Sequence, residues 1–184
     1  MSAWASDRGL VLGQRQVGDK SNEITAIPEL LDVLDIKGAI VTLDAMGCQR
    51  AIASKILERG ADYLVTLKAN QGKKHSAVQE YCATTCFSRS PVDRPVHDEF
   101  DDGHGRLVRR RVFVCPDAVA LEPLRDWPGL KSVLAVETIR GVNGSGKIEA
   151  EIRYFLSSSD DQPEILAKAI RQHWQIENSL HWVL

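Results

Sequence analysis

The chain has 184 residues, enough for one domain with its own core, and 43% of these residues are hydrophobic. Its 23 Lys and Arg are balanced by 25 Asp and Glu, so the net charge of −2 excludes a strongly basic, DNA-coating surface. The sequence contains neither an apolar run of the roughly 18 residues that span a membrane nor a signal-peptide pattern. We therefore expect a cytoplasmic protein without membrane contact.

The first half of the chain predicts two strands, a helix and then a strand–helix–strand unit. The apolar segment 38–44 is typical of a strand covered on both faces, and a helix from Cys48 to Arg59 follows it. A second strand runs from Asp62 to Leu67, so the two strands should be parallel. The elements before this unit are two strands and a helix at Ser2–Ser6, Leu10–Val17 and Thr25–Asp35.

Asp44 is a candidate functional residue because it ends the first strand of this unit. Open α/β sheets place their binding sites at the carboxyl ends of strands. An aspartate after a strand can also cap the next helix. Since that helix is expected to begin near Cys48, Asp44 is poorly placed to cap it.

The second half predicts a helix, several strands and a long C-terminal helix. Two strand-like runs, 131–142 and 147–156, are joined by Asn143-Gly144-Ser145-Gly146, which favours a hairpin. Apolar and polar residues alternate in the second run, as in a half-buried antiparallel strand. The remaining elements are a helix at Lys74–Cys86, a strand at Leu107–Val114 and a helix after Asp161.

Glu177 is the second candidate carboxylate, because it lies on the apolar stripe of the C-terminal helix. At 3.6 residues per turn this stripe consists of Leu166, Ile170, Trp174, Glu177, His181 and Leu184. A carboxylate on a face built for burial needs a cation, a metal or a proton.

Several strings in the chain resemble bacterial insertion-sequence transposases of the Asp-Asp-Glu (DDE) class, and most closely the H-repeat-associated group. The longest are DKSNEITAIP at 19–28, TLDAMGCQ at 42–49 and HWQIEN at 173–178. Shorter matches are LKANQ at 67–71, HGR at 104–106 and LHW at 180–182. The resemblance covers essentially the whole chain.

This resemblance implies an α/β fold, with a ribonuclease H-like mixed sheet flanked by helices. It also implies an inserted β-rich region before the last helix. The chain would then be a single catalytic domain, with residues 1–87 and 159–184 as the core and 88–158 as the insertion.

The implied chemistry is metal-dependent DNA cleavage and strand transfer. Three carboxylates in this class hold two divalent cations, usually Mg²⁺ and sometimes Mn²⁺. By position, Asp44 matches the second acid and Glu177 the third. The implied partners are DNA, as transposon ends and target, and further copies of the chain in a synaptic complex.

The first acid of the family has no match in this chain. In the family it lies on a strand upstream of the segment that here reads Ser2-Ala3-Trp4-Ala5, and neither Asp7 nor Asp19 fits its motif. We therefore expect an inactive, truncated catalytic domain without the N-terminal strand of its core. Backbone hydrogen bonds would then not join the two N-terminal strands to the later parallel pair.

Candidate DNA contacts follow from the same positions. Lys68, Asn70 and Gln71 come just after a strand near the predicted site, and His173 and Trp174 precede Glu177. Arg109 and Arg111 share one face of a strand, with Arg110 on the other, and Arg106 lies nearby beside His104. A solvated strand face or a polar loop would explain the same residue types.

Two further readings remain open. One is a non-catalytic DNA-binding or interfering transposase remnant. The other is a metal hydrolase that uses His173, Glu177 and His181, although two helical turns, roughly 12 Å, separate the two histidines. The cysteines show no zinc-binding spacing, so we expect reduced, buried thiols at Cys48, Cys82, Cys86 and Cys115.

Overall fold

The computed structural model describes residues 2–5, 9–14, 23–87, 95–103, 106–142 and 148–180. Within these ranges the side chains of Glu23, Arg106, Val142 and residues 175–180 lie outside the description. The strands are β1 (Ser2–Ala5), β2 (Leu10–Gln14), β3 (Ile40–Leu43), β4 (Asp62–Leu67), β5 (His97–Gly103), β6 (Arg106–Cys115), β7 (Ser132–Val142) and β8 (Ile148–Ser157). The α-helices are α1 (Glu23–Val33), α2 (Arg50–Glu58), α3 (Lys73–Thr85) and α4 (Pro163–Leu180), and the short 3₁₀ turns are η1 (Ala69–Gln71), η2 (Pro116–Ala120) and η3 (Glu122–Leu124).

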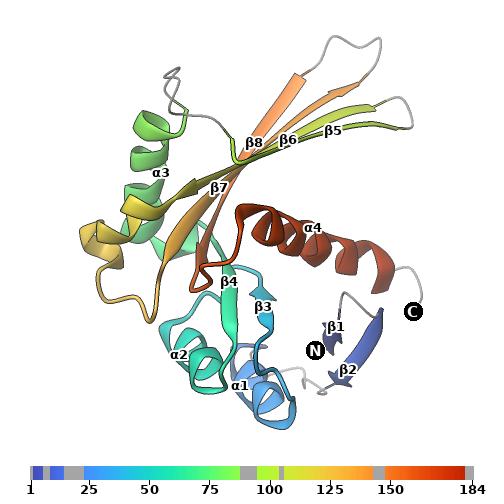
Figure 1. Ribbon diagram of the computed structural model, residues 1–184, viewed down its shortest axis with the longest axis vertical. Coiled ribbons are helices and arrows are strands. Elements are labelled where there is room, and N and C mark those ends of the chain that lie inside the picture. The colour runs from blue at the N-terminus through green and yellow to red at the C-terminus, as the bar shows by residue number, and fades with distance from the viewer. Residues whose placement is uncertain are drawn as a thin grey trace.

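The main element is a six-stranded mixed sheet with the order β3-β4-β8-β7-β6-β5 (Figure 1). The β3–α2–β4 unit is parallel, as predicted, with Ile40 opposite Asp62. The other pairs in the sheet are antiparallel. The predicted α/β class with a mixed sheet and flanking helices is therefore confirmed.

Helices cover both faces of the sheet around β4. On one face, α2 and α3 contribute Ile52, Ile56 and Val78 to a core that includes Tyr63 and Val65 of β4. On the other face α4 provides the cover, with Leu166, Ala167 and Ile170 packed against Leu64, Leu134 and Phe155. Because successive side chains of a strand point to opposite faces, β4 is buried on both sides. The apolar stripe of the C-terminal helix is confirmed at its first two positions.

The β1–β2 hairpin forms a separate two-stranded sheet. Within the described residues no backbone ladder joins it to β3, as expected from the sequence. It lies instead against α1, since a Cβ at Gly13 would be 3.3 Å from the side chains of Leu30 and Leu34. Three apolar residues of β2 remain exposed, Leu10, Val11 and Leu12.

The structure differs from the expected elements at three points. The helix expected from Cys48 begins at Arg50, because a tight turn occupies the residues before it. The edge strand β5 was not predicted, since its sequence is rich in acidic residues. The half-buried alternation expected in β8 does not hold: its first half is mostly exposed, with Ile148 75% and Ile152 40% exposed, and residues 154–157 are buried on both faces. Figure 1 shows why the first half of β8 is exposed, because the part of the sheet that contains it extends past the helices.

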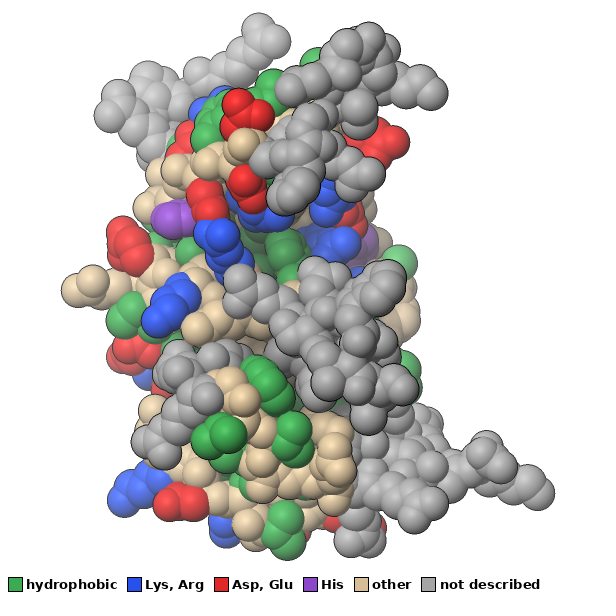
Figure 2. Space-filling view, turned by 90° about the vertical axis from the view of Figure 1, so that its right-hand side faces the viewer, with side chains coloured by type: hydrophobic (Ala, Val, Ile, Leu, Met, Phe, Trp, Pro, Cys, Tyr) green, Lys and Arg blue, Asp and Glu red, His purple; other side chains and the backbone are tan. Residues whose placement is uncertain are grey.

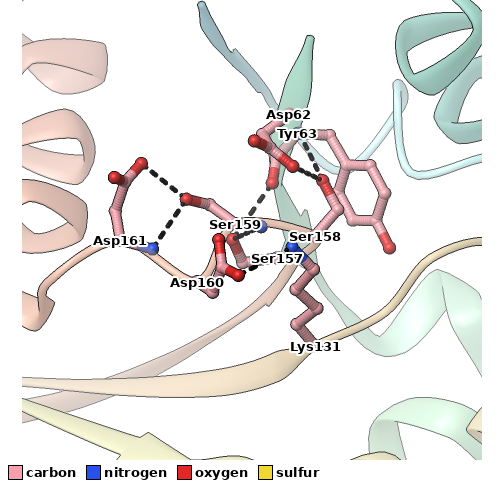
Figure 3. A network of polar contacts seen from close by, with 8 residues as sticks. All are labelled: Asp62, Tyr63, Lys131, Ser157, Ser158, Ser159, Asp160 and Asp161. Atoms are coloured by element: carbon pink, nitrogen blue, oxygen red, sulfur yellow. Dashed lines mark hydrogen bonds and ion pairs between the residues drawn. The ribbon is translucent and has the colours of Figure 1, made fainter. Parts of the chain in front are cut away.

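A serine-rich junction joins the end of β8 to the start of β4 and to the entry of α4 (Figure 3). The Ser158 hydroxyl donates to Asp62 Oδ1 at 2.7 Å and accepts from the Tyr63 amide at 3.0 Å. The Ser157 hydroxyl donates to the Tyr63 carbonyl at 3.2 Å, and the Ser159 hydroxyl donates to Asp161 Oδ2 at 2.6 Å. These bonds determine where α4 leaves the sheet.

All four cysteines are reduced and buried, as expected. No helix in the described part of the chain is long and apolar enough to cross a membrane.

Replacing Ser158 with Ala should destabilise the fold by about 1–3 kcal/mol, because the buried Tyr63 amide loses its side-chain acceptor. Urea unfolding of both proteins would measure the difference. Ser76→Ala is the matched control, since the Ser76 hydroxyl is exposed and bonds only within its own helix turn. Equal losses in both variants would contradict the assigned role of the junction.

Candidate catalytic site

Asp44 directly follows β3 and is exposed at the carboxyl end of this strand. Its Oδ1 accepts hydrogen bonds from the amides of Met46 at 3.0 Å and Gly47 at 3.4 Å. The first residue before α2 is Gln49, which makes no side-chain cap. Asp44 therefore caps its own turn and not the helix, and these amides fix the orientation of its carboxylate.

The turn after Asp44 is tightly packed. The Gly47 amide also donates to the Asp44 carbonyl at 3.1 Å. A Cβ at Gly47 would lie 2.8 Å from Leu43 Cβ, closer than two carbon atoms normally approach. Glycine is therefore needed here for space, so that the chain can reverse directly beneath the end of β3.

Asn70 and Gln71 support this turn from the neighbouring strand. They follow β4 in η1, and the Asn70 side-chain amide donates to the Ala45 carbonyl at 3.2 Å. The Gln71 side-chain amide donates to the Cys48 carbonyl at 2.7 Å. Lys68, which immediately precedes η1, is exposed. The structure therefore shows that Asn70 and Gln71 contact the Asp44 turn. Contact of Lys68, Asn70 or Gln71 with DNA stays a prediction.

Helix α4 contacts β3 through His173. Its Nδ1 lies 3.0 Å from the Thr42 hydroxyl oxygen, and the imidazole tautomer decides which of the two groups donates. Thr42 lies two residues before Asp44, so this contact brings α4 to the carboxyl end of β3. Trp174, the next residue, packs its ring against the Arg153 guanidinium of β8, with the guanidinium carbon 4.7 Å from the ring centre.

Several predicted site residues lie outside the described side chains. Glu177 belongs to α4, one turn after His173, and Arg106 begins β6, but neither side chain is described. His104 and His181 also lie outside the described residues. The assignment of Glu177 as a metal ligand and the His173–Glu177–His181 alternative therefore stay predictions.

Arg109 and Arg111 share one face of β6, as predicted, and both are paired with acids. Arg109 donates to both carboxylate oxygens of Asp98, at 3.0 and 2.6 Å, and Arg111 donates to Glu137 at 2.5 Å. The hydrogen bonds from Arg109 hold the pKa of the Asp98 carboxyl below its ordinary value. In the same way, hydrogen bonding to Arg153 lowers the pKa of Glu151. DNA contact by these arginines stays a prediction.

Arg110 faces a pocket of about 350 Å³ between α4 and strands β5–β7. Val112, Val136 and Ile170 form apolar walls of this pocket, and Trp174 also lines it. The buried Arg110 Nε has no hydrogen-bond partner among the described residues. The sequence indicated that Arg110 points away from Arg109, but gave no sign of a pocket. Figure 2 shows basic and acidic side chains intermingled over the upper part of one face, without a large patch of one sign.

The family profile described as "Transposase DDE domain" matches residues 2–184. The chain is 43% identical over 191 residues to the "H repeat-associated putative transposase YhhI" of Escherichia coli K12, covering all of this chain and 49% of that protein. It is 44% identical over 188 residues to the "Putative transposase YncI" of Escherichia coli O157:H7, covering all of this chain and 47% of the relative. No solved structure matches.

These similarities and the fold define the class as transposase domains of the DDE type. The chain belongs to the DDE transposase family. It spans about half the length of the curated relatives it matches. The family resemblance read from the motifs is therefore confirmed.

Replacing Gln71 with Ala should lower the free energy of unfolding by about 1–2 kcal/mol, because the Cys48 carbonyl loses its side-chain donor. Gln79→Ala is the matched control, since Gln79 is exposed on α3 and should stay within about 0.5 kcal/mol of the parent. Urea unfolding measures both. A Gln71 variant as stable as the Gln79 variant would show that this amide does not support the turn.

Proposed function

We propose that this chain forms part of the catalytic core of a bacterial insertion-sequence transposase acting on DNA in the cytoplasm. Asp44 and Glu177 are two of its metal-binding carboxylates. The observation that carries the proposal is the 3.0 Å contact between His173 of α4 and Thr42 of β3. This contact joins β3 to α4, two residues before Asp44 and four residues before Glu177.

The periods of strand and helix support this pairing. In an extended strand, side chains two residues apart share a face, so Asp44 follows Thr42 on the side that meets α4. In a helix, residues four apart share a face and lie about 6 Å apart along the axis, so Glu177 follows His173. Asp44 and Glu177 are thus both expected to lie close to the contact between Thr42 and His173.

The available donor groups fit a hard divalent cation. Mg²⁺ binds carboxylate oxygens while keeping several waters, and exposed Asp44, oriented by two amides, offers such an oxygen. Bound cations would activate the attacking water or 3′-hydroxyl and stabilise the leaving oxygen of the phosphodiester. Mn²⁺ could bind to the same ligands.

Neighbouring residues have distinct roles in this proposal. Asn70 and Gln71 position Asp44 by holding its turn. Lys68 is exposed beside this turn and supplies a cation for a DNA phosphate. His173 holds α4 against β3, and Trp174 flanks the site on the side of the pocket. Transposon ends, target DNA and further copies of the chain are the proposed partners.

The isolated 184-residue chain is proposed to bind DNA without cutting it. A DDE site needs three carboxylates, and this sequence matches the family motif at only the second and third. The relatives are also about twice as long. The non-catalytic DNA-binding reading is therefore the proposed behaviour of this chain by itself.

Mn²⁺ binding followed by electron paramagnetic resonance tests the two carboxylates. Asp44→Asn and Glu177→Gln remove charge at constant shape, so each should weaken Mn²⁺ binding at least tenfold, about 1.4 kcal/mol. Asp117→Asn, an exposed acid in η2, should bind like the parent. If all three variants bind equally, the metal assignment is wrong.

Labelled terminal-repeat and random DNA tests the behaviour of the whole chain. With Mg²⁺ present, we expect a gel shift at about 50 mM salt and no nicking. Lys68→Ala should reduce the slope of log affinity against log salt by about one, because one phosphate contact is lost.

Lys37→Ala is the matched control, since Lys37 precedes β3 at the opposite end of the strand from Asp44. Nicking that disappears in both Asp44→Ala and Glu177→Ala would refute the proposed inactivity. Absence of any gel shift would refute DNA binding.

A further inference from the structure

Three of the four cysteines converge at one place in the fold, although Cys115 is distant in sequence from Cys82 and Cys86. Cys82 lies in α3, Cys86 directly follows this helix, and Cys115 ends β6. Their sulfur atoms all lie within 4.8 Å of one another. The three residues are 0%, 7% and 3% exposed. The fourth, Cys48, is also buried but does not belong to this cluster.

The backbone explains the convergence. Cys82 and Cys86 are four positions apart, and Cys86 continues the helical backbone as the residue that caps α3, so both lie on the same side of the helix. Cys115 reaches this side from the sheet beneath, next to Phe113, whose ring makes an edge contact with Phe87. Two rigid elements thus present the three sulfurs to one point.

The spacing is suitable for a shared metal ion. A thiolate binds zinc at about 2.3 Å, so two sulfurs on one tetrahedral ion are roughly 3.8 Å apart. Sulfurs within 4.8 Å of one another reach this separation through small side-chain rotations. The donor set contains sulfur alone, which selects thiophilic ions such as Zn²⁺ and Cu⁺ over Mg²⁺.

Other roles for three cysteines fit less well. A reactive or redox-sensing cysteine requires access and an electropositive setting, often a helix N-terminus. This cluster is buried at the C-terminal end of α3, where the helix dipole is negative and favours a cation. Packing explains the burial of each thiol, and the three thiols also hydrogen-bond to one another, which raises the pKa of Cys82. A bound metal ion would displace their protons.

We propose that Cys82, Cys86 and Cys115 form a binding site for one thiophilic metal ion, separate from the carboxylate site. Zn²⁺ would take a fourth ligand such as water, whereas Cu⁺ is satisfied by three thiolates. The ion would fasten the end of α3 to the end of β6. Entry is from the side of Cys86, the most exposed of the three.

The whole chain, purified under reducing conditions, tests this proposal by titration with Zn²⁺ and Cu⁺ against competing chelators in excess Mg²⁺. We expect one ion per chain, undisturbed by Mg²⁺, and X-ray absorption showing three sulfur ligands at about 2.3 Å from bound zinc. This measurement on the parent protein needs no variant. The ion with the higher affinity identifies the class of metal.

Single Cys82→Ser, Cys86→Ser and Cys115→Ser variants should each bind at least about 100-fold more weakly. Cys48→Ser is the matched control and should bind like the parent, because Cys48 is buried outside the cluster. Circular dichroism checks that each variant is folded. No stoichiometric ion in the parent, or equal losses in all four variants, would overturn the proposal. Loss of Mn²⁺ binding at Asp44 would leave it unaffected.

Discussion

The position of every element near the candidate site depends on β4, which is bonded along both of its edges. One edge pairs in parallel with β3 and the other pairs antiparallel with β8. Each neighbour then carries part of the site, since β3 leads to Asp44 and β8 leads through the serine junction to α4. Because β4 is buried on both faces, a shift in its register would expose its apolar side chains and displace both parts together. The candidate site is thus built around a strand that is paired along both edges and buried on both faces.

The turn after Asp44 shows how support and substrate contact can be divided among adjacent residues. Asn70 and Gln71 each donate a side-chain N–H to a carbonyl of this turn. A DNA phosphate accepts hydrogen bonds, and a charged donor binds it about twice as strongly as a neutral amide. Lys68, exposed one residue before η1, is therefore better suited to the phosphate than the two amides that follow it. Residues that look like one polar binding loop in the sequence therefore separate into two side chains that hold the turn, Asn70 and Gln71, and one exposed cation, Lys68, proposed to bind phosphate.

The sequence predicted what depends on local pattern and missed what depends on distant pairing. The parallel β3–α2–β4 unit, the β7–β8 pair and the stripe of α4 were predicted from apolar periodicity, and they are present. The pairing of β8 with β4 could not be predicted, because no local pattern records which edge a strand will meet. The same limit hid the three-cysteine cluster: Cys82 and Cys86 are close in sequence, but only the fold brings Cys115 to them. For the candidate site, Asp44 was placed correctly, whereas the turn contacts of Asn70 and Gln71 required the structure.

The paired arginines bear on how a chain of net charge −2 can approach DNA. Arg109 and Arg111 already bond to Asp98 and Glu137, so at long range each pair is nearly neutral and attracts DNA little. At short range the exposed Arg109–Asp98 pair is not prohibitive, because such a pair contributes at most about 1 kcal/mol and could be exchanged for a phosphate contact, whereas the Arg111–Glu137 pair is partly buried. These arginines would therefore contact DNA only after it had docked, and they would not attract DNA from a distance. In the proposed function, first contact would come from exposed cations such as Lys68, which lies beside the Asp44 turn.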